Sequence, residues 1–266
     1  MPRTSSERTT PKHLSATGLK TYQNCPQAYK LNYADPGAKA PPDRPLLLGG
    51  LVHRALEWLG RAAIAQTAGP NHINPSPDIL SYAIGQAQRG EPADVIEEAR
   101  GLISEAEVNF AGTCLIEKNI EGLLDLDPFP GVQIPVKGFM DRVIAPALDG
   151  LVEVIDYKTG SWELDQGEAA DDVQLALYMA AARQLYPRAA GVSATLHYLR
   201  SGRKVTVSED DSTGWDRAIG LARAICEDQD WQANLSPLCP FCPHRLRCLA
   251  YAAAIKTDER GDAVGV

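Results

Sequence analysis

The sequence predicts an α/β fold with helical additions on its N-terminal side, and two observations support this class. Apolar residues recur at helical spacing in the first hundred residues, whereas short runs rich in β-branched residues begin after about residue 114. The second part then alternates strands, a helix, a hairpin and a further helix. Segments arranged in this order are typical of a sheet covered by helices.

Length and composition are those of a globular protein. The chain has 266 residues, of which 44% are hydrophobic and 23% charged. No run approaches the roughly 18 consecutive apolar residues of a membrane-spanning helix. The first ten residues contain no apolar segment, so we expect no secretory signal and a cytoplasmic location. The net charge of −8 argues against non-specific coating of nucleic acid, but it allows a locally basic site.

The N-terminal part is expected to be mainly helical, after a disordered tail over 1–12. We expect a short helix over 15–25 started by Ser15 or Thr17, a proline-rich loop over 34–46, a helix from Gly49 to about Thr67, and a helical region over 78–112 broken at Gly90–Pro92.

The following part is expected to contain the sheet. Strands are expected over 115–121, 132–145, 151–158, 191–199 and 204–208, and helices over 171–186 and 213–231. Asp149–Gly150 is a strong hairpin signal. We expect one domain over 13–255, with a mainly helical part (13–113), an α/β core (114–232) and a cysteine-rich segment (233–255), followed by a polar tail (256–266).

Two carboxylates and a lysine are candidates for catalysis. Asp156 and Lys158 lie two positions apart on an expected strand, so their side chains share one face. If the strands pair across Asp149–Gly150, Asp141 lies close to Asp156. Carboxylates can hold Mg²⁺ or Mn²⁺, which activates water and neutralises phosphate charge, while an ammonium group stabilises developing charge. This set suits phosphodiester hydrolysis, although such a spacing alone more often marks a surface ion pair.

Three further residues extend this set. Gln174 and Tyr178 are four positions apart on an expected helix and therefore share one face. His53 lies near the start of an earlier helix, where its imidazole is a candidate metal ligand or, taken alone, a structural residue. Glu117 and Glu121 are open as further ligands, with a surface position favoured for both.

In this order and spacing, the motifs resemble the RecB-type branch of the PD-(D/E)XK nuclease superfamily. They are Gly50…His53, Gly138-Phe139-Met140-Asp141-Arg142, Ile155-Asp156-Tyr157-Lys158-Thr159-Gly160 and Gln174…Tyr178. The resemblance implies a restriction-endonuclease-like core, a mixed central sheet flanked by helices. It implies a metal held by His53, Asp141, Asp156 and the Tyr157 carbonyl, water oriented by Lys158, and a supporting or DNA-contacting role for Gln174 and Tyr178. No Walker A motif accompanies these residues, so we expect no helicase motor.

Three of the six cysteines form a C-x₂-C-x₅-C cluster: Cys239, Cys242 and Cys248. Thiolates bind soft or borderline metals, and Cys25 is a candidate fourth ligand. The pattern is similar to the iron–sulfur nucleases of the same branch, including AddB-like and CRISPR-associated adaptation nucleases, which implies a [4Fe–4S] cluster clipping the two ends of the chain together. A zinc site that could include His244 is the alternative. We expect Cys114 and Cys226 to be buried small apolar residues.

The resemblance implies a metal-dependent DNA exonuclease that prefers single strands or DNA ends, in recombination, repair or phage DNA processing. One alternative is a nuclease-fold subunit that acts only with partners, such as a helicase or the proteins of a CRISPR adaptation or recombination complex. Another is a zinc-stabilised DNA-binding protein. Candidate DNA contacts are the basic residues Lys20, Lys30, Arg200, Arg203, Lys204, Arg245 and Arg247, and the aromatic residues Tyr22, Tyr29, Tyr33 and Tyr198.

Overall fold

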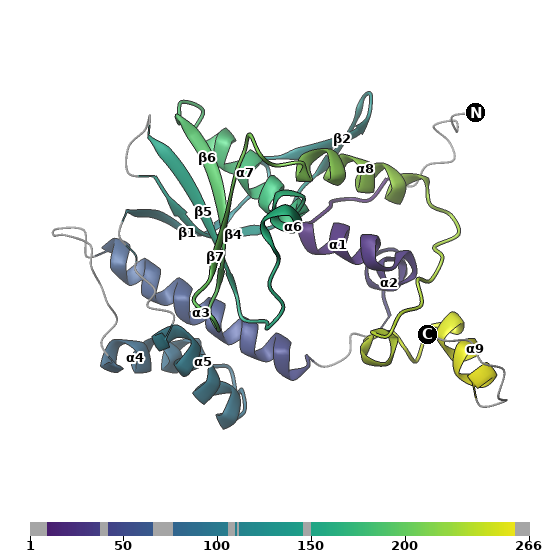
Figure 1. The fold of residues 1–266 in the computed structure, drawn as a ribbon, viewed down its shortest axis with the longest axis horizontal. Coiled ribbons are helices and arrows are strands. Elements are labelled where there is room, and N and C mark those ends of the chain that lie inside the picture. The colour runs from purple at the N-terminus through teal and green to yellow at the C-terminus, as the bar shows by residue number, and fades with distance from the viewer. Residues whose placement is uncertain are drawn as a thin grey trace. The chain divides into compact units, whose positions relative to one another are not determined.

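A computed structural model describes residues 10–37, 42–65, 77–105, 110, 112–145 and 150–258 (Figure 1). Most of the expected tails, 1–9 and 259–266, therefore lies outside the described residues. The chain divides into two compact units. We call residues 42–124 and 137–216 the sheet unit, and residues 1–41, 125–136 and 217–266 the cysteine unit. Within the described ranges, no helix has the length and apolar character needed to cross a membrane.

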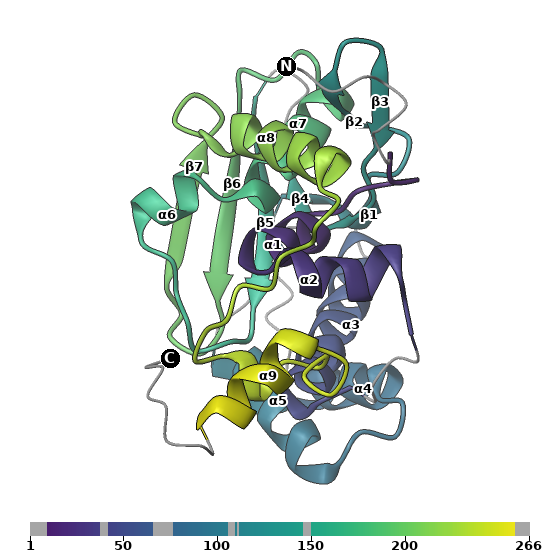
Figure 2. The same ribbon diagram turned by 90° about the vertical axis from the view of Figure 1, so that its right-hand side faces the viewer.

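The sheet unit is built on one five-stranded sheet. In sheet order its strands are β1 (Thr113–Asn119), β4 (Phe139–Ile144), β5 (Leu151–Lys158), β6 (Gly191–Tyr198) and β7 (Lys204–Ser208). Figure 2 shows the strands following one another in this order. β5 and β6 are parallel and the other neighbouring pairs are antiparallel. The predicted α/β class with a mixed central sheet is confirmed.

Helices cover the sheet. They are α3 (Arg44–Ala65), α4 (Pro77–Ala87), α5 (Ala93–Glu105), α6 (Gln166–Ala170) and α7 (Val173–Leu185). Buried side chains of α3, α4 and α5 form one apolar cluster with Ile155 and Tyr157 of β5. Because side chains alternate along a strand, Asp156 is turned to the opposite face, where Gln174 of α7 contacts it. The alternation in β5 therefore separates an apolar face from a polar one.

The long helix α3 begins at Arg44, with Pro45 in its first turn, and not at Gly49 as predicted. Proline is well suited to this position because its fixed φ matches the helix and its missing N–H has no intrahelical partner there. Gly60, further along α3, allows close packing on β1, since a Cβ atom there would lie 2.4 Å from Cδ1 of Ile116. The helix is therefore fixed against the sheet edge that carries β1.

The cysteine unit combines short helices with a β-hairpin. Its elements are α1 (Ala16–Asn24), α2 (Pro26–Tyr29), the π-helical turn η2 (Lys30–Ala34), β2 (Asp125–Phe129), β3 (Val132–Pro135), α8 (Gly214–Glu227, from Arg217 onward), the 3₁₀ turn η3 (Cys239–Phe241) and α9 (Leu249–Asp258). Ser15 caps α1 by accepting a hydrogen bond from the Gly18 N–H, as predicted. Tyr29 stacks on Trp231, with ring centroids 5.8 Å apart, and joins the N-terminal helices to the segment after α8.

Two further predicted elements differ from the structure. The single strand expected over 132–145 is divided into β3 and β4, and β3 pairs with the unpredicted strand β2. The helix expected over 213–231 ends at Glu227. β4 and β5 pair antiparallel, as a hairpin requires, although Asp149 of the predicted turn lies outside the described residues.

Candidate active site

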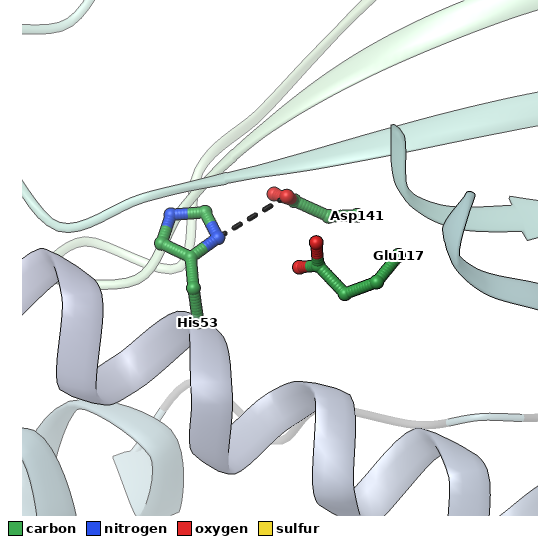
Figure 3. Close-up of side chains that lie close together, drawn as sticks. All are labelled: His53, Glu117 and Asp141. Carbon is green, nitrogen blue, oxygen red and sulfur yellow. Dashed lines mark ion pairs between the residues drawn. The ribbon is translucent and has the colours of Figure 1, made fainter. Parts of the chain in front are cut away.

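Three side chains of the sheet unit converge to form a candidate metal site. One ligand atom from each of His53, Glu117 and Asp141 lies within 4.8 Å of the other two. Figure 3 shows the imidazole reaching from α3 toward the two carboxylates, which come from β1 and β4. His53 Nδ1 lies 3.2 Å from Asp141 Oδ1. The structure therefore brings together two of the predicted ligands and one acid that the sequence placed on the surface.

Glu117 is a candidate ligand that the sequence left open but for which it favoured a surface position. Ile116 pairs with Arg142 and Lys118 with Met140, so Glu117 lies opposite Asp141 in the ladder. Its φ of 47° is in the left-handed region, which is unfavourable for a residue with a side chain. The proximity of Glu117 to Asp141 follows from the register of β1 against β4, which cannot be read from the sequence. Glu121, the other open candidate, pairs instead with Lys137 at 2.9 Å and is exposed.

Asp156 and Lys158 form a second group on β5. Lys158 Nζ lies 2.5 Å from Asp156 Oδ2, and Asp156 is only 3% exposed. Gln174 of α7 donates from Nε2 to Asp156 Oδ1 at 2.9 Å and accepts from Lys158 Nζ at 3.0 Å. The Gln174 amide also lies 2.9 Å from the Tyr178 hydroxyl. The predicted residues Asp156, Lys158, Gln174 and Tyr178 therefore form one hydrogen-bonded network.

A backbone contact links the two groups. The Tyr157 N–H donates a 2.8 Å hydrogen bond to Asp141 Oδ2. The Tyr157 side chain points to the opposite, apolar face. Asp141 is therefore held on one oxygen by β5, while its other oxygen faces His53. The metal-ligand role expected for the Tyr157 carbonyl stays a prediction.

The electrostatics of the site reflect crowded, buried acids. Burial and the nearby Asp141 raise the pKa of Glu117 to about 7. Burial also raises the pKa of Asp156, against the opposing effect of Lys158. Burial alone would lower the pKa of His53, but the neighbouring Asp141 outweighs it and raises the value to about 9. The ion pair with Asp156 likewise keeps the pKa of Lys158 above its usual value despite burial.

The donor set fits a divalent cation. Two carboxylates and an imidazole offer hard oxygen ligands and one nitrogen ligand, a combination that suits Mg²⁺ or Mn²⁺. Burial, and after it repulsion from Asp141, raises the pKa of Glu117 and so disfavours its ionised form. A bound cation would stabilise that ionised form, so these side chains are suited to hold one.

The four predicted cluster cysteines lie around one cavity of the cysteine unit. Cys25, Cys239, Cys242 and Cys248 all line it, together with residues of α2 and α9. Backbone N–H groups point at two of the sulfurs, from Asn234 to Cys25 at 3.4 Å and from Ser236 to Cys239 at 3.3 Å. The structure thus brings Cys25 to cysteines more than 200 positions away in the sequence.

His244, the alternative zinc ligand, has another partner, since its Nε2 lies 2.9 Å from the Asn32 side-chain oxygen. Of the two cysteines outside the proposed cluster, Cys226 is buried, as predicted. Cys114 of the sheet unit is only half-buried, and its sulfur lies 3.2 Å from both the Val143 carbonyl and the Tyr186 hydroxyl, so the prediction of a buried small apolar residue was wrong there.

Several predicted DNA contacts are engaged within the protein. Arg200 pairs with Glu98, and Arg203 Nη1 lies 3.3 Å from Glu163. Tyr29 and Tyr198 are buried, so neither ring can stack on a base in this structure. Tyr22 is part-buried and donates to Asp228 at 2.8 Å. Among the four aromatic candidates, Tyr33 is the exposed one.

Comparisons with known proteins concern the family and the fold of the chain. A family model described as the PD-(D/E)XK nuclease superfamily matches residues 13–249. The crystal structure of a candidate exonuclease from Eubacterium rectale aligns with a TM-score of 0.52 and 14% identity, covering 91% of this chain and 93% of its own. At this identity the alignment shows a shared fold. The structure named SSO0001 aligns with 17% identity over 77% of this chain and 95% of its own, but its TM-score of 0.38 is too low to support an argument. No curated protein matches the chain significantly.

Proposed function

Because the chain belongs to the PD-(D/E)XK nuclease superfamily, we propose that it is a divalent-metal-dependent deoxyribonuclease, an exonuclease acting on single-stranded DNA or on DNA ends. One observation carries this proposal. The group formed by His53, Glu117 and Asp141 lies beside the buried pair of Asp156 and Lys158, to which the Tyr157 N–H connects it. A protein that only binds DNA has no need to gather carboxylates, which repel phosphate.

In this proposal Glu117, Asp141 and Asp156 supply oxygen ligands for Mg²⁺ or Mn²⁺, and His53 supplies a nitrogen ligand. When bound, such an ion lowers the pKa of water and neutralises phosphate charge. Asp156 must turn one oxygen away from Lys158 or share it, because both of its oxygens now face Lys158 and Gln174. His53 must release its proton to become a ligand, which the approach of a cation favours.

Lys158 acts as a cation in this mechanism. Its pKa lies above the usual value because Asp156 stabilises the ammonium form, so it carries a proton at neutral pH. An ammonium group cannot accept a proton from water. Lys158 therefore donates hydrogen bonds, either to the attacking water or to a phosphate oxygen on which charge develops.

Gln174 and Tyr178 are positioning residues. Gln174 holds both Asp156 and Lys158 through opposite ends of one amide, which fixes the direction of each side chain. Tyr178 in turn contacts that amide. On α7, Tyr178 is buried and Gln174 is partly buried, and we propose that both affect the reaction through Asp156 and Lys158.

We further propose that Cys25, Cys239, Cys242 and Cys248 hold a [4Fe–4S] cluster. Four cysteines around one cavity, with N–H groups aimed at two sulfurs, support this assignment. A tetrahedral zinc site would hold its sulfurs about 3.8 Å apart, given Zn–S bonds of about 2.3 Å. Four thiolates also suit such a zinc site, which is therefore the alternative metal centre.

Cleavage of end-labelled single-stranded DNA tests the proposed activity. Anaerobically purified protein is expected to shorten a linear strand with Mg²⁺ or Mn²⁺ and to leave it intact in EDTA. A circular single strand is expected to resist, because an exonuclease needs an end. Lys158→Ala is expected to lower the rate by about a hundredfold or more, since it removes the cation beside the reacting phosphate.

Lys137→Ala is the matched control. Lys137 belongs to the same unit, but its side chain is partly exposed and pairs with Glu121 outside the proposed site. We expect this variant to cleave at the wild-type rate. Cleavage that persists in EDTA, or a folded Lys158→Ala variant that cuts normally, would contradict the proposal.

A further inference from the structure

An exposed tryptophan follows the proposed catalytic lysine by four positions. The Trp162 side chain is 77% exposed, although it lies in the connection between β5 and α6 of the sheet unit. Exposing so large an apolar ring gives up the favourable free energy that its burial would contribute. Its immediate neighbours include Gly160, Ser161 and Glu163, so the ring does not continue an apolar patch of this loop.

The loop that carries Trp162 is anchored on both sides. On one side, Arg200 Nε donates to the Thr159 carbonyl at 2.8 Å. On the other, the Leu164 N–H donates to the Tyr198 hydroxyl at 2.9 Å. The next residue, Asp165, forms a capping box at the start of α6. The ring is therefore presented to solvent by a backbone that is held in place.

Glu163 strengthens this anchoring. Its carboxylate accepts a 2.5 Å hydrogen bond from Ser201 and lies 3.3 Å from Arg203, both in the β6–β7 turn. Tyr198, which the sequence suggested as a stacking residue, is 2% exposed and supports the loop instead. None of the contacts described here that hold the loop involves the Trp162 side chain.

The position of Trp162 brings it within reach of a bound strand. Four residues of extended chain span at most about 14 Å, so the Trp162 backbone lies within that distance of Lys158. This distance is short enough for one DNA strand to contact both Lys158 and the indole. Aromatic side chains near such a path bind unpaired bases by stacking, whatever the sequence.

From this geometry we infer that Trp162 is a stacking platform for an unpaired nucleobase of the substrate strand. The inference rests on the proposed function and specifies its substrate class. A paired base is stacked within its duplex and offers no free face, so Trp162 selects single-stranded DNA or frayed ends. A rigid loop favours this contact because little conformational entropy is lost on binding.

Binding without cleavage tests the inference. Fluorescence anisotropy of a labelled oligo-dT strand of about 12 nucleotides would be measured with the full chain, in EDTA and at fixed salt. Trp162→Ala is expected to weaken binding by about 5- to 150-fold, the range for loss of one base–aromatic stack. Trp162→Phe, which keeps a ring, should recover most of the affinity.

Two controls separate stacking from a structural effect. Leu151→Ala removes another exposed apolar side chain, 70% exposed, at the opposite end of β5 and about 23 Å from Lys158. It should bind oligo-dT as the wild type does. A strand made only of abasic residues should bind wild type and Trp162→Ala equally, because it offers phosphates without bases.

The outcomes distinguish this inference from the proposed function. Equal binding of oligo-dT by wild type and Trp162→Ala would overturn the stacking role alone, since the metal-dependent cleavage assay is read separately. An equal loss of binding on the abasic strand would also overturn it, because the defect would then not involve bases. Failure of the wild type to bind oligo-dT would also overturn the stacking role, whereas the proposed function is judged by the metal-dependent cleavage assay.

Discussion

At the scale of single residues, Glu117 contributes to the candidate metal site from an unfavourable backbone conformation. A φ of 47° is costly for glutamate by roughly 1–2 kcal/mol, and it is retained where the surrounding structure fixes it. Pairing of its neighbours with Arg142 and Met140 supplies that constraint. The backbone strain at Glu117 and the cost of ionising its carboxylate both lower the stability of the metal-free protein. We expect both features in a site that binds a cation.

Replacement of Glu117 by glutamine therefore has two opposite expected effects. Mn²⁺ affinity should fall about tenfold or more, because a charged ligand is lost. Stability without metal should rise at pH 8, since the folded-state pKa of about 7 exceeds that of the unfolded chain and the ionised form is penalised above it. Calorimetric titration measures the first effect and thermal unfolding in EDTA the second.

Glu121→Gln is the control for this pair of measurements. Glu121 lies close in sequence but is exposed and bonded to Lys137. Both its Mn²⁺ affinity and its metal-free stability should match the wild type to within about 0.5 kcal/mol, as for most surface changes. If Glu117→Gln behaved like this control, the carboxylate would not be a ligand.

At the scale of elements, α7 determines how the network around Asp156 is held. Asp172 caps this helix by accepting hydrogen bonds from the N–H groups of Gln174 and Leu175. Gln174 thus begins in the first turn, where its backbone is fixed by the cap and its amide reaches Asp156 and Lys158. A loosened first turn would therefore disturb both groups without touching either directly.

Asp172→Ala tests this coupling between the helix cap and the site. We expect the free energy of unfolding to fall by about 1 kcal/mol, the usual cost of losing such a cap. Cleavage should slow several-fold because Gln174 no longer holds Lys158 in one direction. Asp172→Asn, which retains a capping oxygen, should restore stability and most of the rate. A stability loss with an unchanged rate would show that the first turn does not position the network.

Elements with strong local signals were predictable, and those that depend on pairing were not. The Ser15 cap, the break between α4 and α5, and the β6–β7 hairpin follow from local residue chemistry. Within 132–145, the apolar residues look continuous, but Pro135 ends β3 and β4 starts only at Phe139. The order and alternation of Asp141, Asp156 and Lys158 predicted their grouping, whereas Glu117 depended on a ladder register between distant strands.

At the scale of the whole molecule, one buried histidine makes the stability of the sheet depend on pH. His197 of β6 is 3% exposed, and its Nε2 has no hydrogen-bond partner among the described residues. Burial, with Lys204 and Arg142 nearby, lowers the pKa of His197 to about 4. The ordinary value is about 6.5, so between these two values the unfolded chain binds the proton and the folded chain does not.

Stability should therefore fall as the pH decreases from 6.5 toward 4. The stability associated with neutral His197 is fully present above pH 6.5, and roughly 3 kcal/mol of it is lost by pH 4. Denaturant unfolding of His197→Gln, which cannot take up the proton, should show a shallower pH dependence by about that amount. His13→Gln, a change at an exposed histidine, should keep the wild-type slope. An unchanged slope in His197→Gln would place the acid sensitivity elsewhere.

The proposed cluster would connect residues that are far apart in the sequence, because it joins Cys25 to Cys239, Cys242 and Cys248. Closing a loop of about 200 residues restricts the unfolded chain strongly, so cluster loss should destabilise the protein far more than its local contacts suggest. Cys25→Ser should lose the iron, about four atoms per chain in the wild type, and lower the unfolding temperature. Cys114→Ser, at a cysteine of the sheet unit, should keep both. Metal analysis measures the iron and zinc content, and calorimetry measures the unfolding temperature. Retention of iron by Cys25→Ser would remove this residue from the ligand set. One zinc per wild-type chain would establish the alternative metal.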